Sequence, residues 1–130
     1  MRRKEHGQSL VEFALLLPIL LIILAGVFDL GRAYYGYVVI TDAAAEGAAY
    51  GSSHPNDTAG IIARAVAAST GLVEVNPGYV EIIKPTVAVG SPITVRVSYD
   101  HLLVTPLING ALGGTLTLRA EATEVIITLD

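Results

Sequence analysis

Cysteine and tryptophan are absent from this sequence, and charged residues make up only 15% of it. Without cysteine, the chain has no disulfide bond, no thiolate metal site and no thiol nucleophile. His6, His54 and His101 are scattered along the chain, and neither they nor the carboxylates show metal-ligand spacing. A P-loop, a dinucleotide fingerprint and a nucleophile elbow are also missing. We therefore expect no enzymatic activity, no catalytic residue, no metal and no other cofactor.

Basic residues are few, and three of the eight (Arg2, Arg3 and Lys4) lie in the first seven positions. The formal net charge is −4, and without residues 1–7 only five basic residues oppose eleven acidic ones. An acidic chain lacks the electrostatic surface that nucleic-acid binding needs. We therefore expect no nucleic-acid partner.

Hydrophobic residues are abundant at 52%, and they are concentrated near the N-terminus. Residues 10–28 contain a single charged side chain, Glu12. About twenty apolar residues cross a bilayer as a helix, so the segment of about 10–28 is predicted to span a membrane once, in contact with lipid. Because basic flanks stay cytoplasmic, the N-terminus should be inside and the remainder outside.

Helix-compatible residues continue well beyond the apolar run. Alanines 43–45, 48 and 49 favour helix, whereas glycines 31, 36 and 47 each disfavour it by about 1 kcal/mol. One long helix is predicted over residues 8–52, and some forty residues would reach roughly 60 Å, twice the hydrocarbon thickness. Its second half should therefore stand outside the membrane.

The remaining residues, 53–130, predict a small extracytoplasmic α+β head. Asp57 is a candidate N-cap for a short helix over residues 58–70, and Pro55 breaks the preceding one. Strands are predicted within residues 79–85, 91–100 and 115–129, with an apolar loop or short helix at 102–114. Strands after helices indicate an antiparallel α+β arrangement. The apolar positions of the last strand change parity between Ala122 and Val125, which predicts a bulge or bend there.

The N-terminal stretch resembles a known family. A short basic leader precedes "GQSLVEFALLLPILLIILAGVFDLGR", in which Gly7 to Phe13, Pro18, Asp29, Gly31 and Arg32 match the start of TadE-like proteins. These are minor pseudopilins of the tight-adherence (Flp) type IV pilus system. The resemblance covers about residues 7–51, although Tyr50 stands where the family commonly has arginine. It implies a pilin-like fold, with the long helix packed on a small antiparallel sheet and one short extra helix.

The resemblance also implies a class III signal peptide. A prepilin peptidase would remove the leader, residues 1–7, at the Gly7–Gln8 bond. Glu12 would then be the fifth residue of the mature chain, where its carboxylate could pair with the new amine of a neighbouring subunit. Other pilins and pseudopilins, and the inner-membrane assembly platform, are the further partners implied, for a pilus used in adhesion.

Several alternatives remain open. Glu12 could instead lie at the cytoplasmic edge without a partner, and the leader could remain as an uncleaved signal anchor. Pro18 is either a tolerated membrane proline or a kink that shapes helix packing. The small residues Ala43, Gly47 and Gly51 fall on one helix face and could pack on this protein's own sheet or on a partner helix.

Alternatives to the role of minor pilin also remain open. The chain could be an anchored binding module outside any filament, or the main filament subunit. The expected location is the bacterial cytoplasmic membrane, with incorporation in a surface pilus as a further possibility.

Overall fold

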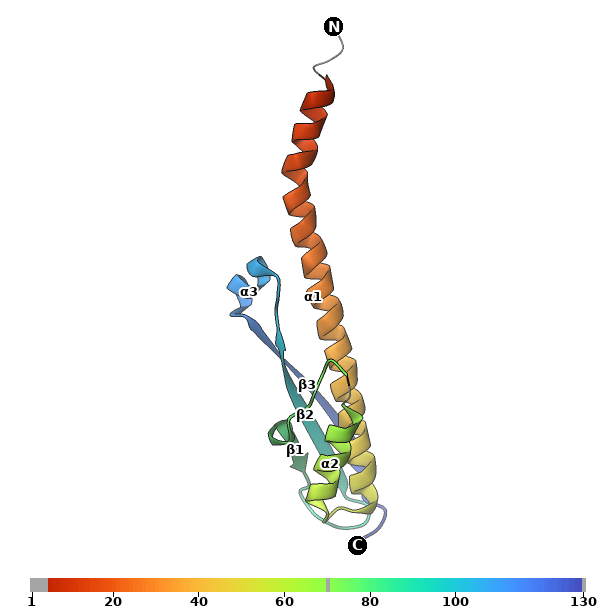
Figure 1. The fold of residues 1–130 in the computed structure, drawn as a ribbon. Helices are drawn as coiled ribbons and strands as arrows, with labels where there is room; N and C mark the ends of the chain where they lie inside the picture. Colours follow the sequence, from red (N-terminus) through yellow and green to blue (C-terminus); the bar gives the residue numbers. More distant parts are fainter. Residues whose placement is uncertain (1–4, 70, 130) are drawn as a thin grey trace. The chain divides into compact units, whose positions relative to one another are not determined.

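The computed structural model describes residues 5–69 and 71–129, and the basic cluster at residues 2–4 lies outside them. Helices and strands follow the order in Figure 1. The helices are α1 (Glu5–Ser53), α2 (Thr58–Ala68) and α3 (Pro106–Leu112), with a short 3₁₀ helix, η1 (Pro77–Tyr79). The strands are β1 (Val80–Ile83), β2 (Pro92–Leu102) and β3 (Thr115–Val125).

The predicted α+β class is confirmed. The three strands form one sheet in the order β1-β2-β3, and β1 pairs antiparallel to β2 with Val80 opposite Val97. The β2 and β3 strands also run in opposite directions, because Thr94 contacts Thr123 while Asp100 contacts Thr117. The long N-terminal helix is confirmed as well, since α1 continues without interruption through its glycines and through Pro18.

The chain divides into two compact units. The first, here called the N-terminal unit, holds the described residues up to Arg32 together with Leu102–Thr115. The second, called the sheet unit, holds Ala33–His101 and the chain from Leu116 onward. The α1 helix contributes residues to both units.

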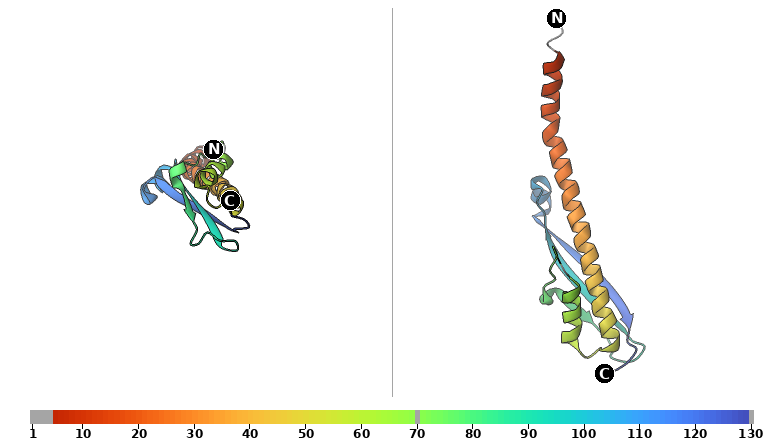
Figure 2. Two further views of the ribbon diagram at one scale, coloured as in Figure 1. Left: turned by 90° about the horizontal axis from the view of Figure 1, so that it is seen from below. Right: turned by 45° about the vertical axis from the view of Figure 1, so that its right-hand side comes forward.

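The sheet unit has a single apolar core between α1, α2 and one face of the sheet. Figures 1 and 2 show the C-terminal half of α1 along that face, with α2 beside it. Inward and outward residues alternate along β2, as predicted, and Ile93, Val95 and Val97 are fully buried. The fully buried helical members of the core are Ile40, Ala43, Ala44, Ala48, Ile61 and Ala65.

The turn before α2 follows the predicted chemistry. Asp57 is the N-cap of α2, and its carboxylate accepts a hydrogen bond from the backbone N–H of Gly60 at 2.9 Å. The Tyr50 hydroxyl donates to the same carboxylate at 2.8 Å, and His54 stacks on the Tyr50 ring. Because these bonds join the end of α1 to the start of α2, they set the path of the chain between the two helices.

The predicted change of face near the C-terminus is wrong. Ile126 is fully buried, whereas Val125, Ile127 and Leu129 are half or more exposed, so the alternation of β3 continues in its original phase. Strand β3 ends at Val125, and the next two backbone N–H groups donate to carbonyls outside β2. The Ile126 N–H donates to the Ser91 carbonyl, and the Ile127 N–H donates to the Ser52 carbonyl.

Candidate functional site

The acid in the apolar run lies on the first turns of α1. Glu12 is exposed, and the side-chain amide of Gln8, one turn earlier, donates to its carboxylate at 3.3 Å. Among residues 5–69 and 71–129, no basic side chain forms an ion pair with Glu12. Within the described chain, the carboxylate therefore has a neutral hydrogen-bond donor but no compensating charge.

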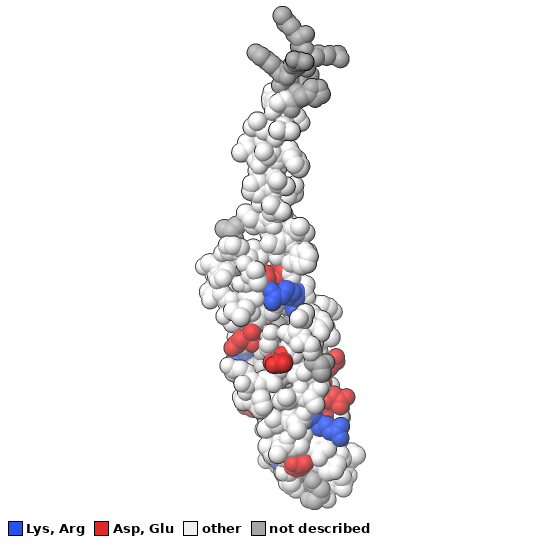
Figure 3. Space-filling view, viewed as in Figure 1, with Lys and Arg blue, Asp and Glu red and all other residues white. Residues whose placement is uncertain are grey.

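The helix that carries Glu12 is apolar and has no partner of its own. Side chains from Gly7 to Leu24 are all exposed, and the segment is hydropathic enough to cross a membrane. In the face drawn in Figure 3, the upper part of α1 shows no charged side chain. Pro18 lies inside this segment without ending the helix. One such helix in the described chain is consistent with single-pass membrane anchoring.

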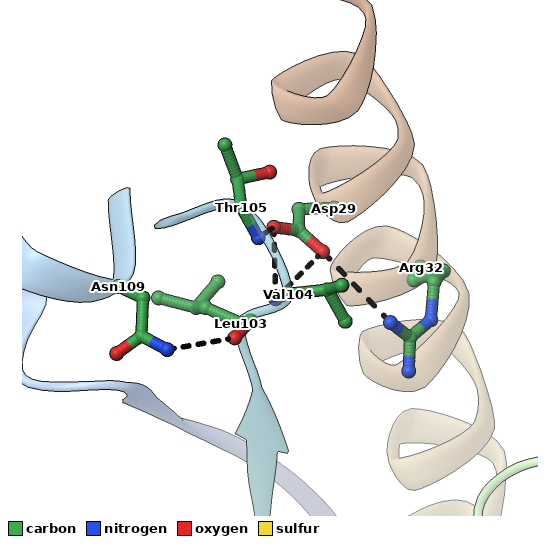
Figure 4. Close-up of polar contacts among 6 residues, drawn as sticks. All are labelled: Asp29, Arg32, Leu103, Val104, Thr105 and Asn109. Carbon is green, nitrogen blue, oxygen red and sulfur yellow. Dashed lines mark hydrogen bonds and ion pairs between the residues drawn. The ribbon is translucent and has the colours of Figure 1, made fainter. Parts of the chain in front are cut away.

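The first carboxylate after the apolar run, Asp29, is almost fully buried in the N-terminal unit. It accepts hydrogen bonds from the backbone N–H of Thr105 at 2.7 Å and from that of Val104 at 3.1 Å (Figure 4). The guanidinium of Arg32 lies 3.8 Å from the other carboxylate oxygen. Asp29 thus attaches the segment before α3 to the helix.

These neighbours stabilise the charged form of Asp29, which lies beyond the predicted span. The nearby hydroxyl and the backbone N–H of Thr105 lower its pKa below the ordinary value, with smaller contributions from the Val104 N–H and the Arg32 guanidinium. Burial acts in the opposite direction but does not outweigh them. The carboxylate is therefore an ionised acceptor at neutral pH, which strengthens its hydrogen bonds to the backbone.

The small residues of α1 lie where the helix meets the rest of the sheet unit. A Cβ atom on Gly47 would lie 3.1 Å from Val95 Cγ1 and 3.3 Å from Ala65 Cβ. On Gly51 it would lie 2.7 Å from Ile93 Cδ1. Ala43 is fully buried in the same core. Because Gly47 and Gly51 have no side chain, α1 approaches both β2 and α2 closely at these positions.

The described residues contain no group of three or more histidine, cysteine or acidic side chains that could hold a metal ion. Glu12, the acid inside the apolar run, bonds to an amide rather than to a second carboxylate or a nucleophile. The geometry around Glu12 therefore suits electrostatic pairing with an outside group.

Comparison with known families addresses this N-terminal region. The model of the TadE-like protein family matches residues 7–49. The match confirms, for this segment, the resemblance drawn from the sequence. It includes Gly7, Glu12, Pro18 and Asp29, and it ends before the sheet begins. No curated protein and no solved structure matches the chain.

Asp29 is the residue of the TadE-like segment whose structural role the sequence did not predict. The sequence did mark Asp29 as a candidate, because Asp29, Gly31 and Arg32 belong to the motif that follows the predicted span. Its partners, however, are backbone groups more than seventy residues away, and backbone groups leave no pattern in a sequence.

Proposed function

We propose that this protein is a minor pilin, or pseudopilin, that takes part in assembly of a Tad surface pilus used in adhesion. It is a non-enzymatic subunit, anchored once in the bacterial cytoplasmic membrane with its N-terminus inside and the sheet unit outside. A prepilin peptidase removes residues 1–7. The mature chain then associates with other pilins and with the inner-membrane assembly platform.

The observation that carries this proposal is Glu12, exposed near the start of a membrane-length apolar helix and without an ion pair to any residue that the structure describes. A lone carboxylate within a membrane helix costs roughly 2.5–3.5 kcal/mol at the bilayer centre and less near an edge. Removal of the leader after Gly7 would create an amine on Gln8, and the same amine on a neighbouring subunit offers the missing positive charge. In low dielectric this pair attracts strongly, whereas either charge alone is penalised.

The same pairing would specify the axial register of two packed helices. An amine at the first residue and an acid at the fifth lie about 6 Å apart along a helix axis. Pairing between subunits therefore requires an axial offset of about this size, and other offsets leave both charges unmatched. Glu12 would thus act in assembly, with the kink or the packing at Pro18 as a secondary contribution.

The first experiment is to determine the mature N-terminus. The full chain is co-expressed with an active prepilin peptidase or with an inactivated one, and its intact mass is measured. A chain that begins at Gln8 only with the active enzyme supports the proposal. If the chain begins at Met1 or Arg2 in both cases, Gln8 has no free amine to pair with Glu12. An anchored binding module is then the better description.

The second experiment separates the role of Glu12 from that of charge in general. Glu12→Gln is compared with Glu46→Gln, which removes another exposed carboxylate from the same helix. We expect Glu12→Gln to reduce the number of pili per cell and Glu46→Gln to leave it unchanged, with equal protein levels. Labelled subunits counted along each filament then distinguish a minor subunit, with few copies, from the main one.

A further inference from the structure

We propose that the segment Leu102–Thr115, which includes α3, is a second membrane contact that lies among the lipid headgroups and upper acyl chains. It would meet the bilayer surface where the spanning part of α1 emerges. The inference rests on the proposed anchoring of α1 and adds a lipid-binding surface that is separate in sequence from the span.

The composition of this segment is that of an interfacial element. From Leu102 to Leu118 the chain contains no acidic, basic or histidine side chain. Leu102, Val104 and Leu112 are 68%, 67% and 58% exposed. Large apolar side chains gathered on one exposed segment usually mark a surface that binds a partner or a membrane.

Two contacts within the N-terminal unit place the segment beside the end of the predicted span. The Ile108 Cδ1 atom lies 3.3 Å from the point where a Cβ on Gly26 would stand. Gly26 is two residues, or about 3 Å of helical rise, inside the predicted end of the span at residue 28. The second contact is the pair of hydrogen bonds from Val104 and Thr105 to Asp29.

These two contacts set the depth of the segment. Interfacial helices lie with their apolar face about 5–10 Å into the boundary between headgroups and acyl chains. A segment held against Gly26 and Asp29 lies at that level whenever α1 spans the bilayer. Its position follows from contacts within one molecule, so lipid is available to it whether or not another subunit is present. This favours lipid over a second copy as the occupant.

The backbone of the segment is also suited to a poorly hydrated environment. Polar backbone groups in contact with lipid must be satisfied by the protein itself. The Leu103 N–H donates to the Gly114 carbonyl, and the Asn109 amide donates to the Leu103 carbonyl. Asp29 accepts from the next two N–H groups. Gly113 and Gly114, both with positive φ, then turn the chain from α3 into β3.

The absence of cysteine makes a direct test possible. Single variants Leu112→Cys, Val27→Cys and Glu46→Cys of the full chain carry an environment-sensitive fluorophore. Each is reconstituted in phosphatidylcholine vesicles at a low protein-to-lipid ratio, with or without lipids that bear a quenching nitroxide near the headgroup. Val27 reports the span, and Glu46 reports water, because it lies 18 residues beyond residue 28, or roughly 27 Å of helical rise.

Quenching of the Leu112 probe to an extent similar to that of Val27, with Glu46 unquenched, would support the inference. Quenching at Val27 without quenching at Leu112 would overturn it while leaving the anchoring of α1 intact. Absence of quenching at Val27 would contradict the anchoring itself, and the inference would fail with it.

A second measurement addresses the alternative occupant. The rate at which Leu112→Cys reacts with a membrane-impermeant maleimide is followed as the protein is diluted into excess lipid. Slow reaction at every dilution supports lipid cover. Reaction that becomes fast on dilution would show that a second copy covered this surface and would overturn the proposal.

Discussion

Replacing Gly51 with alanine tests how closely α1 must approach the core of the sheet unit. The new methyl group would lie 2.7 Å from Ile93 Cδ1 and 3.2 Å from Ile61 Cδ1. Both distances are shorter than ordinary carbon–carbon contacts, and both isoleucines are fully buried. The methyl group therefore enters only if side chains in the core shift.

Two opposing free energies decide the result. Alanine is better than glycine inside a helix by about 1 kcal/mol. Insertion of a methyl group into a packed core usually costs about 1–3 kcal/mol. The expected net effect is a loss of about 0–2 kcal/mol in the free energy of unfolding. Ala49→Gly, at an exposed position of the same helix, measures the first quantity alone and should cost about 1 kcal/mol.

The assay is urea unfolding of the full chain in mild detergent. The chain has no tryptophan, so near-ultraviolet circular dichroism follows the partly buried rings of Tyr50 and Tyr99. If Gly51→Ala were instead about 1 kcal/mol more stable than the natural chain, the tight packing would be refuted. The row of small residues would then be better explained by contact with a partner helix.

Three further predictions follow from single contacts. Ile61→Ala should lower the free energy of unfolding by about 2–5 kcal/mol in the same urea assay, because Ile61 is fully buried and its loss leaves a cavity. Asp57 has a pKa lowered by the N–H of Gly60 and the hydroxyl of Tyr50, so its stabilisation is present at neutral pH and lost below about pH 4. Unfolding of Asp57→Asn should accordingly show a weaker dependence on pH between 5 and 3, and an unchanged dependence would contradict this role. Asp29→Asn should speed hydrogen exchange at residues 103–105 in lipid nanodiscs while exchange in β2 stays as before, whereas equal exchange in both proteins would exclude the attachment at Asp29.

The apolar run and the helix-forming residues after it made the long helix predictable, the order of helices and strands indicated the class of fold, and alternation predicted the inner face of β2. The run at residues 10–28 is too apolar to be anything but buried or membrane-embedded, and strict alternation in β2 follows from the pleat of a half-buried strand. The cap at Asp57 was predictable for a local reason, because its partner lies only three residues away.

The end of β3 shows where such reasoning fails. The odd-numbered positions at residues 125–129 are all apolar (Val125, Ile127 and Leu129), so composition favoured the wrong face. The structure buries Ile126, because hydrogen bonds to Ser91 and to Ser52 hold the backbone in register with neighbours distant in the sequence. The sequence also left open whether residues 102–114 were a loop or a helix, and α3 there has only seven residues.

Features that depend on neighbours along the chain follow from the amino-acid order alone. These are the membrane-length helix, the acid at Glu12, the motif that the TadE-like family shares and the alternating strands. The folded structure was needed to identify the backbone groups that Asp29 binds, the side chains that crowd Gly51 and the apolar segment beside Gly26. These contacts join residues far apart in the chain, so their geometry depends on the packing of a whole unit rather than on any local preference.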